Sequence, residues 1–301
     1  MIDTHPVLIF GGGEMGQALT HLVNVNESPD QAIVFDVNKN RSKCSADELR
    51  EVLPKSRIIF ISVPSHAIEH VTSVINELRS TDQPVVALTK GMTRESDRFT
   101  GEVLREELGE SVAVLTGPML AEEISGGLPT QALCAGSKDA YQELRDVLPL
   151  SQFELEYTPD IIGASVCGLL KNIYSIGFGI ADGLELGGNF RGLLATTALS
   201  EMMSIVERFG GERATALTAA GIGDLIATVS SSYSNNYAAG LMLARRGHTD
   251  IVSEGRCSMK SFARRFPEES SFALLSNVKR IILEEQSVDH FRDYLMRTAH
   301  V

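Results

Sequence analysis

Short apolar runs alternate with amphipathic stretches through the first half of the chain. Each run is rich in β-branched residues and bounded by polar or turn residues, which is typical of strands buried on both faces of a parallel sheet. Between two runs, residues 65–79 place Ile68, Val71, Ile75 and Leu78 at helical spacing. The predicted strands are VLIF (7–10), AIVFD (32–36), RIIFIS (57–62), VVALT (85–89), VAVL (112–115), TQALCAG (130–136) and FELEYT (153–158), with a helix at 138–148 between the last two. This alternation predicts a doubly wound α/β domain.

After Pro159 the strand signals fade. The stretch at 161–186, IIGASVCGLLKNIYSIGFGIADGLEL, is long, apolar and dotted with small residues, as in a buried helix that is packed closely by its neighbours. Further helices are predicted at 190–209, 212–220, 236–246, 256–264 and 271–284. We therefore predict an α/β domain over residues 1–158 and an all-helical domain over residues 159–301.

The charge balance narrows the range of partners. The chain has 301 residues and a net charge of −12, and an acidic surface repels phosphate backbones, which argues against nucleic acid and anionic membranes. Four cysteines without a C-x-x-C pair form neither a disulfide framework nor a zinc site, and they suit a reducing cytosol. No signal peptide and no membrane insertion are expected. We expect a cytoplasmic protein with a small-molecule ligand, and an anionic ligand would need a local cluster of cations.

The first predicted strand ends in a glycine pattern that opens a helix. Gly11 permits the tight turn, Gly13 lets the backbone approach a pyrophosphate, and Gly16 lets helix and strand pack closely. Asp36 ends the second strand, where a carboxylate accepts hydrogen bonds from ribose hydroxyls and repels a 2′-phosphate. The alternative is a glycine-rich turn with a strand-end carboxylate that caps a loop. We predict a Rossmann-type domain that binds NAD in preference to NADP. The loop residues expected at the cofactor are Gly11, Gly13, Glu14, Met15 and Gly16.

Five further motifs follow in order along the chain. They are SVPSHAI (62–68), TKGM (89–92), GPMLAEEISGGLPTQA (117–132), CGLLKNIYSIGFGIADGL (167–184) and GIGDLIATVSSSYSNN (221–236). Together they resemble the NAD-dependent glycerol-3-phosphate dehydrogenase family, from residue 7 to about residue 297. The two strongest stretches are Lys171-Asn172 and Gly223-Asp224-Leu225. The resemblance implies reduction of dihydroxyacetone phosphate by NADH, or the reverse reaction.

The resemblance also implies roles for individual residues. Hydride addition to a ketone builds negative charge on oxygen, so a cation or proton donor must sit beside that oxygen. Lys171 matches the family's catalytic lysine, the general acid in reduction, and Asp224 matches a carboxylate that would hold its ammonium group. Lys90 matches a second lysine that approaches the substrate. The remaining matched positions are Asn172, Thr228 and Asn236 for the substrate, and Pro64 and Glu123 for the cofactor.

Some of these residues have structural alternatives. Asp224 can cap the helix that follows it, and Lys90 can be a solvated residue before a turn. Lys171 lies in an apolar stretch, where a charge without a partner is costly. His66 and His70 have ligand-like spacing, but no third ligand is evident, so no metal site is expected.

The chain departs from the family at residues that bear on the substrate. The family has Ser-Arg-Asn where this chain has Ser234-Asn235-Asn236, and its arginine grips the substrate phosphate. A second family arginine is replaced by Thr197, and Met15 stands where many members carry an aromatic residue. Asparagine offers a neutral amide in place of a charged fork, and losing such a buried contact costs about 2–5 kcal/mol. The candidates for compensation are Arg191, Arg245, Arg246, Arg256, Lys260, Arg264 and Arg265.

Three functions therefore stay open at the level of sequence. The first is glycerol-3-phosphate dehydrogenase activity on a phosphorylated triose, with altered contacts to the phosphate. The second is a dehydrogenase of the same fold that acts on a different small hydroxy compound, and the third is an NAD-binding sensor with little catalysis. Intact Lys171, Asn172 and Asp224 argue against the sensor. The apolar C-terminal helices leave a homodimer open.

Overall fold

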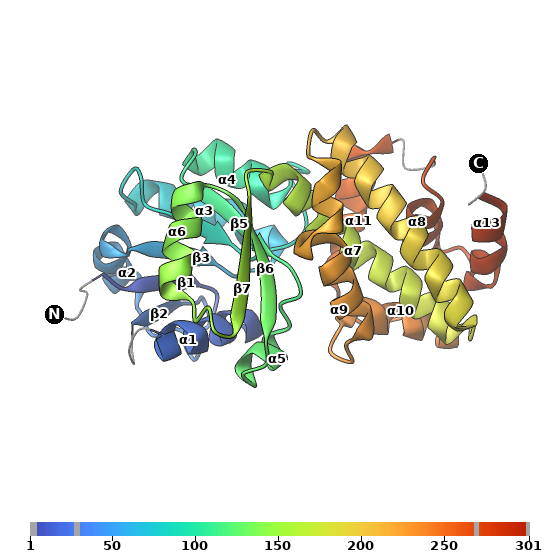
Figure 1. Ribbon diagram of the computed structural model, residues 1–301, viewed down its shortest axis with the longest axis horizontal. Coiled ribbons are helices and arrows are strands. Elements are labelled where there is room, and N and C mark those ends of the chain that lie inside the picture. The colour runs from blue at the N-terminus through green and yellow to red at the C-terminus, as the bar shows by residue number, and fades with distance from the viewer. Residues whose placement is uncertain (1–4, 27–30, 268–270, 299–301) are drawn as a thin grey trace. The chain divides into compact units, whose positions relative to one another are not determined.

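The computed structural model describes residues 5–26, 31–267 and 271–298. The chain contacts divide it into two compact units, Met1–Lys90 with Arg98–Ile161 and Gly91–Asp97 with Ile162–Val301. The first unit is α/β and the second is helical (Figure 1). The predicted division after residue 158 lies close to the one found after Ile161. The sequence gives no sign that Gly91–Asp97 joins the helical unit, because no periodic pattern marks this short segment.

The α/β unit contains a seven-stranded sheet within the described residues. Its strands are β1 (Val7–Phe10), β2 (Ala32–Phe35), β3 (Ile58–Ile61), β4 (Val85–Ala87), β5 (Val112–Thr116), β6 (Thr130–Gly136) and β7 (Phe153–Thr158), in the order β2-β1-β3-β4-β5-β6-β7. The first five pair in parallel, as predicted, but β6 runs antiparallel to β5 and β7 is parallel to β6. An apolar run indicates that a strand is buried but not its direction, so the sequence does not predict the reversal at β6.

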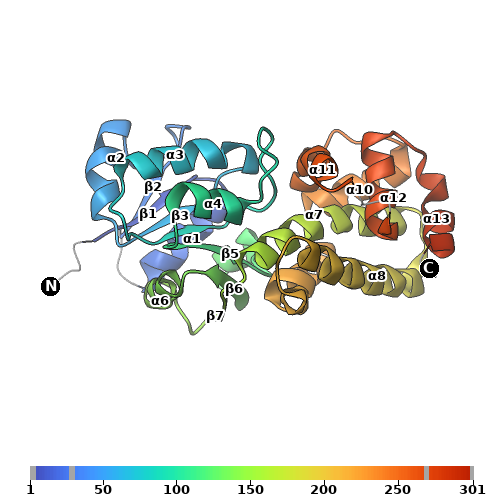
Figure 2. The ribbon, with the colours of Figure 1, turned by 90° about the horizontal axis from the view of Figure 1, so that it is seen from above.

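Helices cover both faces of this sheet (Figure 2). They are α1 (Glu14–Asn26), α2 (Ala46–Val52), α3 (Ile68–Leu78), α4 (Thr100–Leu108), α5 (Ala121–Ser125) and α6 (Lys138–Val147). Helices α3 and α4 lie on one face, and α1 and α6 lie on the other (Figure 2). Helix α5 packs into the same core as α1 and α6. On the second face Leu19 and Leu22 of α1 and Leu144 of α6 pack with Ile9 and Phe60 of the strands in one apolar core. The carboxyl ends of the parallel strands β1 to β5 lie along one edge of the sheet.

The helical unit is formed by helices in the second half of the chain. They are α7 (Ile161–Gly183), α8 (Gly187–Arg208), α9 (Asp224–Ser230), α10 (Asn235–Arg246), α11 (Glu254–Arg265), α12 (Ala273–Leu283) and α13 (Phe291–Thr298). The predicted helix at 212–220 is wrong, because a 3₁₀ turn at Arg213–Leu217 and a π-helical turn at Ala219–Gly223 occupy this region. The hydroxyl of Thr218 accepts from the N–H of Ala220 and donates to the carbonyl of Thr215, which gives the backbone an alternative to a continuous α-helix.

Helix α7 is the central helix of this unit, between α8 and the helices α10 and α12 (Figure 2). It is long and apolar enough to pass for a membrane span, with a mean hydropathy of 1.4, but 94% of that window is buried inside the protein. A Cβ on Gly179 would lie 2.1 Å from the carbonyl oxygen of Tyr237, and one on Gly240 would lie 2.0 Å from that of Ile176. The glycines therefore allow the backbones of α7 and α10 to touch, as the small residues in the sequence predicted.

A buried carboxylate, Glu201, joins three helices of the unit. Its two oxygens accept hydrogen bonds from the N–H groups of Leu274 (2.7 Å) and Leu275 (3.1 Å) at the start of α12, and from the hydroxyl of Tyr174 on α7 (3.0 Å). Burial raises the pKa of Glu201 from 4.5 to about 7, against the opposing effect of the three donors. The carboxyl group therefore takes up a proton on folding at mildly acidic pH.

This raised pKa predicts a pH-dependent contribution to stability. The contribution is fully present below the unfolded pKa of about 4.5 and is lost as the pH rises through about 7, because the unfolded chain releases the proton first. We expect the difference in free energy of unfolding between the wild type and Glu201→Gln to narrow by up to about 3 kcal/mol over that range. Urea denaturation at a series of pH values measures it. A difference that does not change with pH would contradict the burial of an ionisable group here.

Candidate active site

The residues predicted to bind the cofactor all follow carboxyl ends of parallel strands. Gly11 follows β1, Asp36 follows β2 and Pro64 follows β3. Glu123 lies on α5, after β5, and Lys90, which is predicted for the substrate, follows β4 at the same edge. In open α/β sheets, ligands bind outside this edge of the strands. The fold of the α/β unit thus brings the predicted cofactor residues to the edge where a dinucleotide is bound.

The glycine loop has the geometry of a dinucleotide cradle. Gly11 has a φ of +100°, and a Cβ there would lie 2.4 Å from the carbonyl oxygen of Ser62. A Cβ on Gly16 would lie 1.9 Å from the carbonyl oxygen of Gly11, so only glycine permits this contact of helix and turn. Gly13 is different, because a Cβ on it would meet nothing within 4 Å. Its open side is a place where the backbone of α1 can approach a pyrophosphate.

The carboxylate of Asp36 supports the same loop. Its oxygens accept hydrogen bonds from the N–H of Gly12 and the N–H of Asn38, both at 2.7 Å. A carboxylate has about four acceptor positions, so about two remain for ribose hydroxyls. Glu14 is exposed in the first turn of α1, whereas the half-buried side chain of Met15 packs against the core of the sheet. These residues fit a bound dinucleotide.

Three further predicted residues follow strands at this edge. The ammonium of Lys90 donates to the carbonyl oxygen of Gly117 at 3.3 Å, so it is bound to the loop after β5 and does not merely point into solvent. Pro64 is exposed at the start of the 3₁₀ turn Ser65–Ala67. Glu123 is exposed on the five-residue helix α5. Their functional roles stay predictions.

In the helical unit the structure brings Lys171, Asp224 and Thr228 together. The ammonium of Lys171 donates to Oδ1 of Asp224 (3.0 Å) and to the hydroxyl of Thr228 (2.9 Å). The lysine is 8% exposed and the aspartate 2%, so the ion pair is shielded from bulk water. Asp224 is the first residue of α9, and its carboxylate is bonded to the ammonium of Lys171. This arrangement places a proton-carrying group at a fixed position in a dry environment.

The two predicted substrate amides are already bonded to each other. Asn172 donates to the carbonyl of Gly168 (3.1 Å), and its own oxygen accepts from the amide of Asn236 (3.0 Å). The oxygen of Asn236 accepts from the N–H of Gly255 at the start of α11 (2.9 Å). These amides link α7, α10 and α11 beside Lys171. Asn235, in contrast, is exposed as the first residue of α10.

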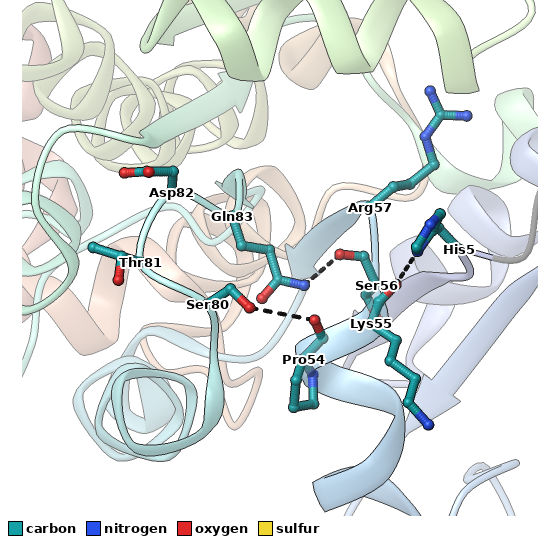
Figure 3. Close-up of a pocket in the computed structure, with 9 residues that line it drawn as sticks. All are labelled: His5, Pro54, Lys55, Ser56, Arg57, Ser80, Thr81, Asp82 and Gln83. Carbon is teal, nitrogen blue, oxygen red and sulfur yellow. Dashed lines mark hydrogen bonds between the residues drawn. The ribbon is translucent and has the colours of Figure 1, made fainter.

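A polar depression in the α/β unit lies away from the glycine loop (Figure 3). It measures about 450 Å³ and is lined by residues that precede β3 and β4, and by one residue that precedes β1. Figure 3 shows the amide of Gln83 directed at the carbonyl of Ser56, and the hydroxyl of Ser80 directed at that of Pro54. The depression is therefore at the amino ends of these strands, at the opposite end from Gly11 and Asp36, and it is not the cofactor site. Its lining is His5, Pro54, Lys55, Ser56, Arg57, Ser80, Thr81, Asp82 and Gln83.

Sequence reasoning missed two features of these sites. Arg41 packs against the glycine loop, because a Cβ on Gly12 would lie 2.9 Å from the Cβ of Arg41. The cations at 39, 41 and 43 that follow Asp36 were the available signal. Helix α11 begins at Glu254, two residues before its predicted start, and this places Gly255 within its first turn. The first turn of α11 has few apolar residues, so hydrophobic periodicity does not mark where the helix begins.

A dinucleotide cradle and a buried lysine–carboxylate pair define the class of this protein, which is a nicotinamide-dependent dehydrogenase with an α/β unit and a helical unit. Models of the NAD-dependent glycerol-3-phosphate dehydrogenase N-terminus and C-terminus match residues 6–142 and 160–293. The chain belongs to the NAD-dependent glycerol-3-phosphate dehydrogenase family, and the sequence-based assignment is confirmed.

Individual relatives agree with this assignment. A glycerol-3-phosphate dehydrogenase of Halothermothrix orenii, described as using NAD(P)+, is 32% identical over 264 residues, which span 81% of this chain and 77% of the relative. The corresponding protein of Clostridium acetobutylicum is 31% identical, over 79% of this chain and 78% of its own. The crystal structure of glycerol-3-phosphate dehydrogenase from Coxiella burnetii superimposes with a TM-score of 0.81 at 27% identity, over 97% of this chain and 98% of that one.

The different surroundings of two glycines predict different effects of the same substitution. Gly13→Ala meets open space, so we expect the free energy of unfolding to change by no more than about 1 kcal/mol. The new methyl group stands where the pyrophosphate would approach, and we expect the Kd for NADH to rise about ten- to a hundredfold. Titration of NADH fluorescence and urea denaturation measure the two quantities.

Gly16→Ala is the matched control, because its methyl group meets the backbone of Gly11. We expect this variant to lose about 1–3 kcal/mol of stability or more. Unchanged affinity for NADH in Gly13→Ala would show that the dinucleotide does not pass over this glycine.

Proposed function

We propose that this chain interconverts glycerol 3-phosphate and dihydroxyacetone phosphate with a nicotinamide dinucleotide. The observation that carries the proposal is the buried ammonium of Lys171, bonded to Asp224 and Thr228 in a chain of this family. A phosphorylated small-molecule substrate is supported by the names of the relatives. A different hydroxy compound or a sensor role has no comparable support.

Lys171 acts as the proton donor when the ketone is reduced. Negative charge develops on the carbonyl oxygen, and Nζ of Lys171 delivers its proton there, while in the oxidation the neutral amine takes the proton from the hydroxyl. Asp224 holds the nitrogen in place and stabilises its charged form, and the hydroxyl of Thr228 provides a second fixed partner. The bound dinucleotide supplies or accepts the hydride. In the α/β unit, Lys90 is the second cation assigned to the substrate.

The cofactor is NAD, and NADP is also admitted. Gly13 and the N-terminus of α1 hold the pyrophosphate, and the remaining lone pairs of Asp36 hold the ribose. Arg41 beside the loop offers a cation to a 2′-phosphate, in keeping with relatives described as using NAD(P)+. Pro64 and Glu123 line the cofactor from the ends of β3 and β5.

We propose that the protein works in the cytoplasm on a small molecule, as the sequence predicts. All four cysteines carry free thiols, and Cys44, Cys134 and Cys167 are buried, which suits a reducing cytoplasm. Neither nucleic acid nor insertion into a membrane is needed for the activity, and a homodimer is compatible with it. The net charge of −12 makes a local cation necessary wherever the phosphate binds.

Steady-state oxidation of NADH tests the proposal. We expect saturable turnover with dihydroxyacetone phosphate and a much lower kcat/KM with free dihydroxyacetone, because a charge-assisted phosphate contact contributes about 1.5–3 kcal/mol. NADPH replaces NADH at a lower kcat/KM, because Asp36 repels its phosphate. Clear binding of NADH without turnover of the phosphate ester would overturn the assignment, and a panel of other ketones would then be tried.

A further inference from the structure

The substrate phosphate requires a cation that the start of α10 does not provide. Asn235 is the exposed first residue of this helix, at the position where the family resemblance expects an arginine, and its amide is neutral. A phosphate dianion is bound most strongly by the planar guanidinium group of arginine, which offers two parallel N–H donors. Another side chain near this point must therefore bind the phosphate, if the proposed function holds.

The first turns of α10 and α11 are in direct contact through one side-chain hydrogen bond. Asn236 is the second residue of α10, and its oxygen accepts from the N–H of Gly255, the second residue of α11, at 2.9 Å. The amide of Asn236 also bonds to Asn172, whose neighbour in the chain is Lys171. The positive ends of two helix dipoles thus meet next to Asn172, the residue that follows Lys171, and this field favours an anion.

Arg256 is the cation at this junction. It is the third residue of α11, and helical side chains lean towards the N-terminus of their helix. One N–H of its guanidinium donates to the carbonyl of Ile251 at 2.6 Å, upstream of the helix, so the group does lie over the helix start. A guanidinium has five N–H donors. Among the described residues Arg256 has no carboxylate partner, so most of these donors remain available.

The other candidate cations are engaged or distant. Arg191 is paired with Asp182 and lies over the ring of Phe178, and Arg264 is paired with Asp97. Arg265 donates to the backbone of Asp97 and stacks on Phe209. Arg245 and Arg246 are in the last turn of α10, about 15 Å along the helix from Asn235. Lys260 is exposed one turn further along α11.

A buried hydroxyl at the same helix start also lacks a partner. Ser253 is the N-cap of α11, the residue is 4% exposed, and its Oγ makes no hydrogen bond within the described part of the chain. An N-cap hydroxyl ordinarily accepts from the second or third N–H of its helix, but here Asn236 takes the second. The hydroxyl of Ser253 is therefore left with a free donor beside the N–H groups of the first turn. The nearby carboxylate of Glu254 accepts from Ser258, one turn along the helix.

We propose that Arg256, together with the first turn of α11 and the hydroxyl of Ser253, binds the phosphate group of the substrate in place of an arginine at position 235. This inference rests on the proposed function and assigns the anion contact within it. Arg256 sets the preference for a phosphorylated substrate, whereas Lys171 carries the proton. The phosphate is then held through Gly255, Asn236 and Asn172 at a fixed position relative to Lys171.

Steady-state kinetics of Arg256→Met test the assignment. We expect the KM for dihydroxyacetone phosphate to rise about ten- to a hundredfold, because a charge-assisted contact is lost. The Kd for NADH and the low activity with free dihydroxyacetone stay unchanged. Competitive inhibition by inorganic phosphate weakens by a similar factor. Arg246→Met, an equal change of charge on α10, leaves the KM within about twofold of the wild type.

Two further variants make the test specific. Asn235→Arg in the Arg256→Met background is expected to recover much of the lost affinity, because it restores a guanidinium at the neighbouring helix start. If Arg256→Met does not fold, Arg256→Lys takes its place, with an expected rise in KM of several-fold. A KM that does not change in the folded Arg256 variant would overturn the inference.

The failure of this inference is distinguishable from failure of the proposed function. Turnover of dihydroxyacetone phosphate by the wild type, with a KM that Arg256→Met leaves unchanged, overturns the role of Arg256 alone. No turnover by the wild type overturns the proposed function. Calorimetric titration with inorganic phosphate then decides the matter for Arg256, since binding that Arg256→Met abolishes supports the anion site and binding that it leaves unchanged rejects it.

Discussion

The buried charge of Lys171 is the constraint on which the helical unit depends. An ammonium group in an apolar helix is tolerated only beside a partner of opposite charge, and Asp224 is that partner at 3.0 Å. Removing one member of such a pair costs about 3–5 kcal/mol, because the other charge is left buried and unpaired. The position of α9 relative to α7 is therefore constrained by this ion pair. The interaction that makes the lysine tolerable also fixes the position of its proton.

Close backbone packing also fixes the position of α10 relative to α7. Gly179 on α7 and Gly240 on α10 leave no room for side chains, so the two helices touch along their backbones. This contact holds Asn236 against Asn172, and Asn236 in turn holds the first turn of α11. Lys171 and the starts of α10 and α11 are consequently connected through α7, because Asn172 follows Lys171 in the chain and is hydrogen-bonded to Asn236. The glycines of this long apolar helix are thus required for the contact of α7 with α10.

The sequence predicted the features that follow from local pattern and missed those that follow from tertiary contacts. All seven strands and the central helix could be predicted, because buried apolar patterns mark them. The group of Lys171, Asp224 and Thr228 could be predicted only through the resemblance of its motifs to a known family. The antiparallel β6 and the turns at 213–223 could not, since apolar runs carry no direction and Thr218 acts through its own hydrogen bonds. From the sequence alone, Arg191 and Arg256 are equal candidates for the contact to the substrate phosphate. Only the structure shows that the first is paired with Asp182.

The central claim is that the buried ammonium of Lys171 delivers the proton to the carbonyl oxygen. A single-turnover experiment tests it most directly, by mixing the protein and NADH with saturating dihydroxyacetone phosphate and following the loss of NADH absorbance in the wild type and in Lys171→Met. Methionine keeps most of the length and removes the proton. The account predicts unchanged binding of NADH and a turnover step that is slower by about 10²–10⁴-fold. A rate in the folded variant within about threefold of the wild type, well short of the usual contribution of general acid catalysis, would contradict it.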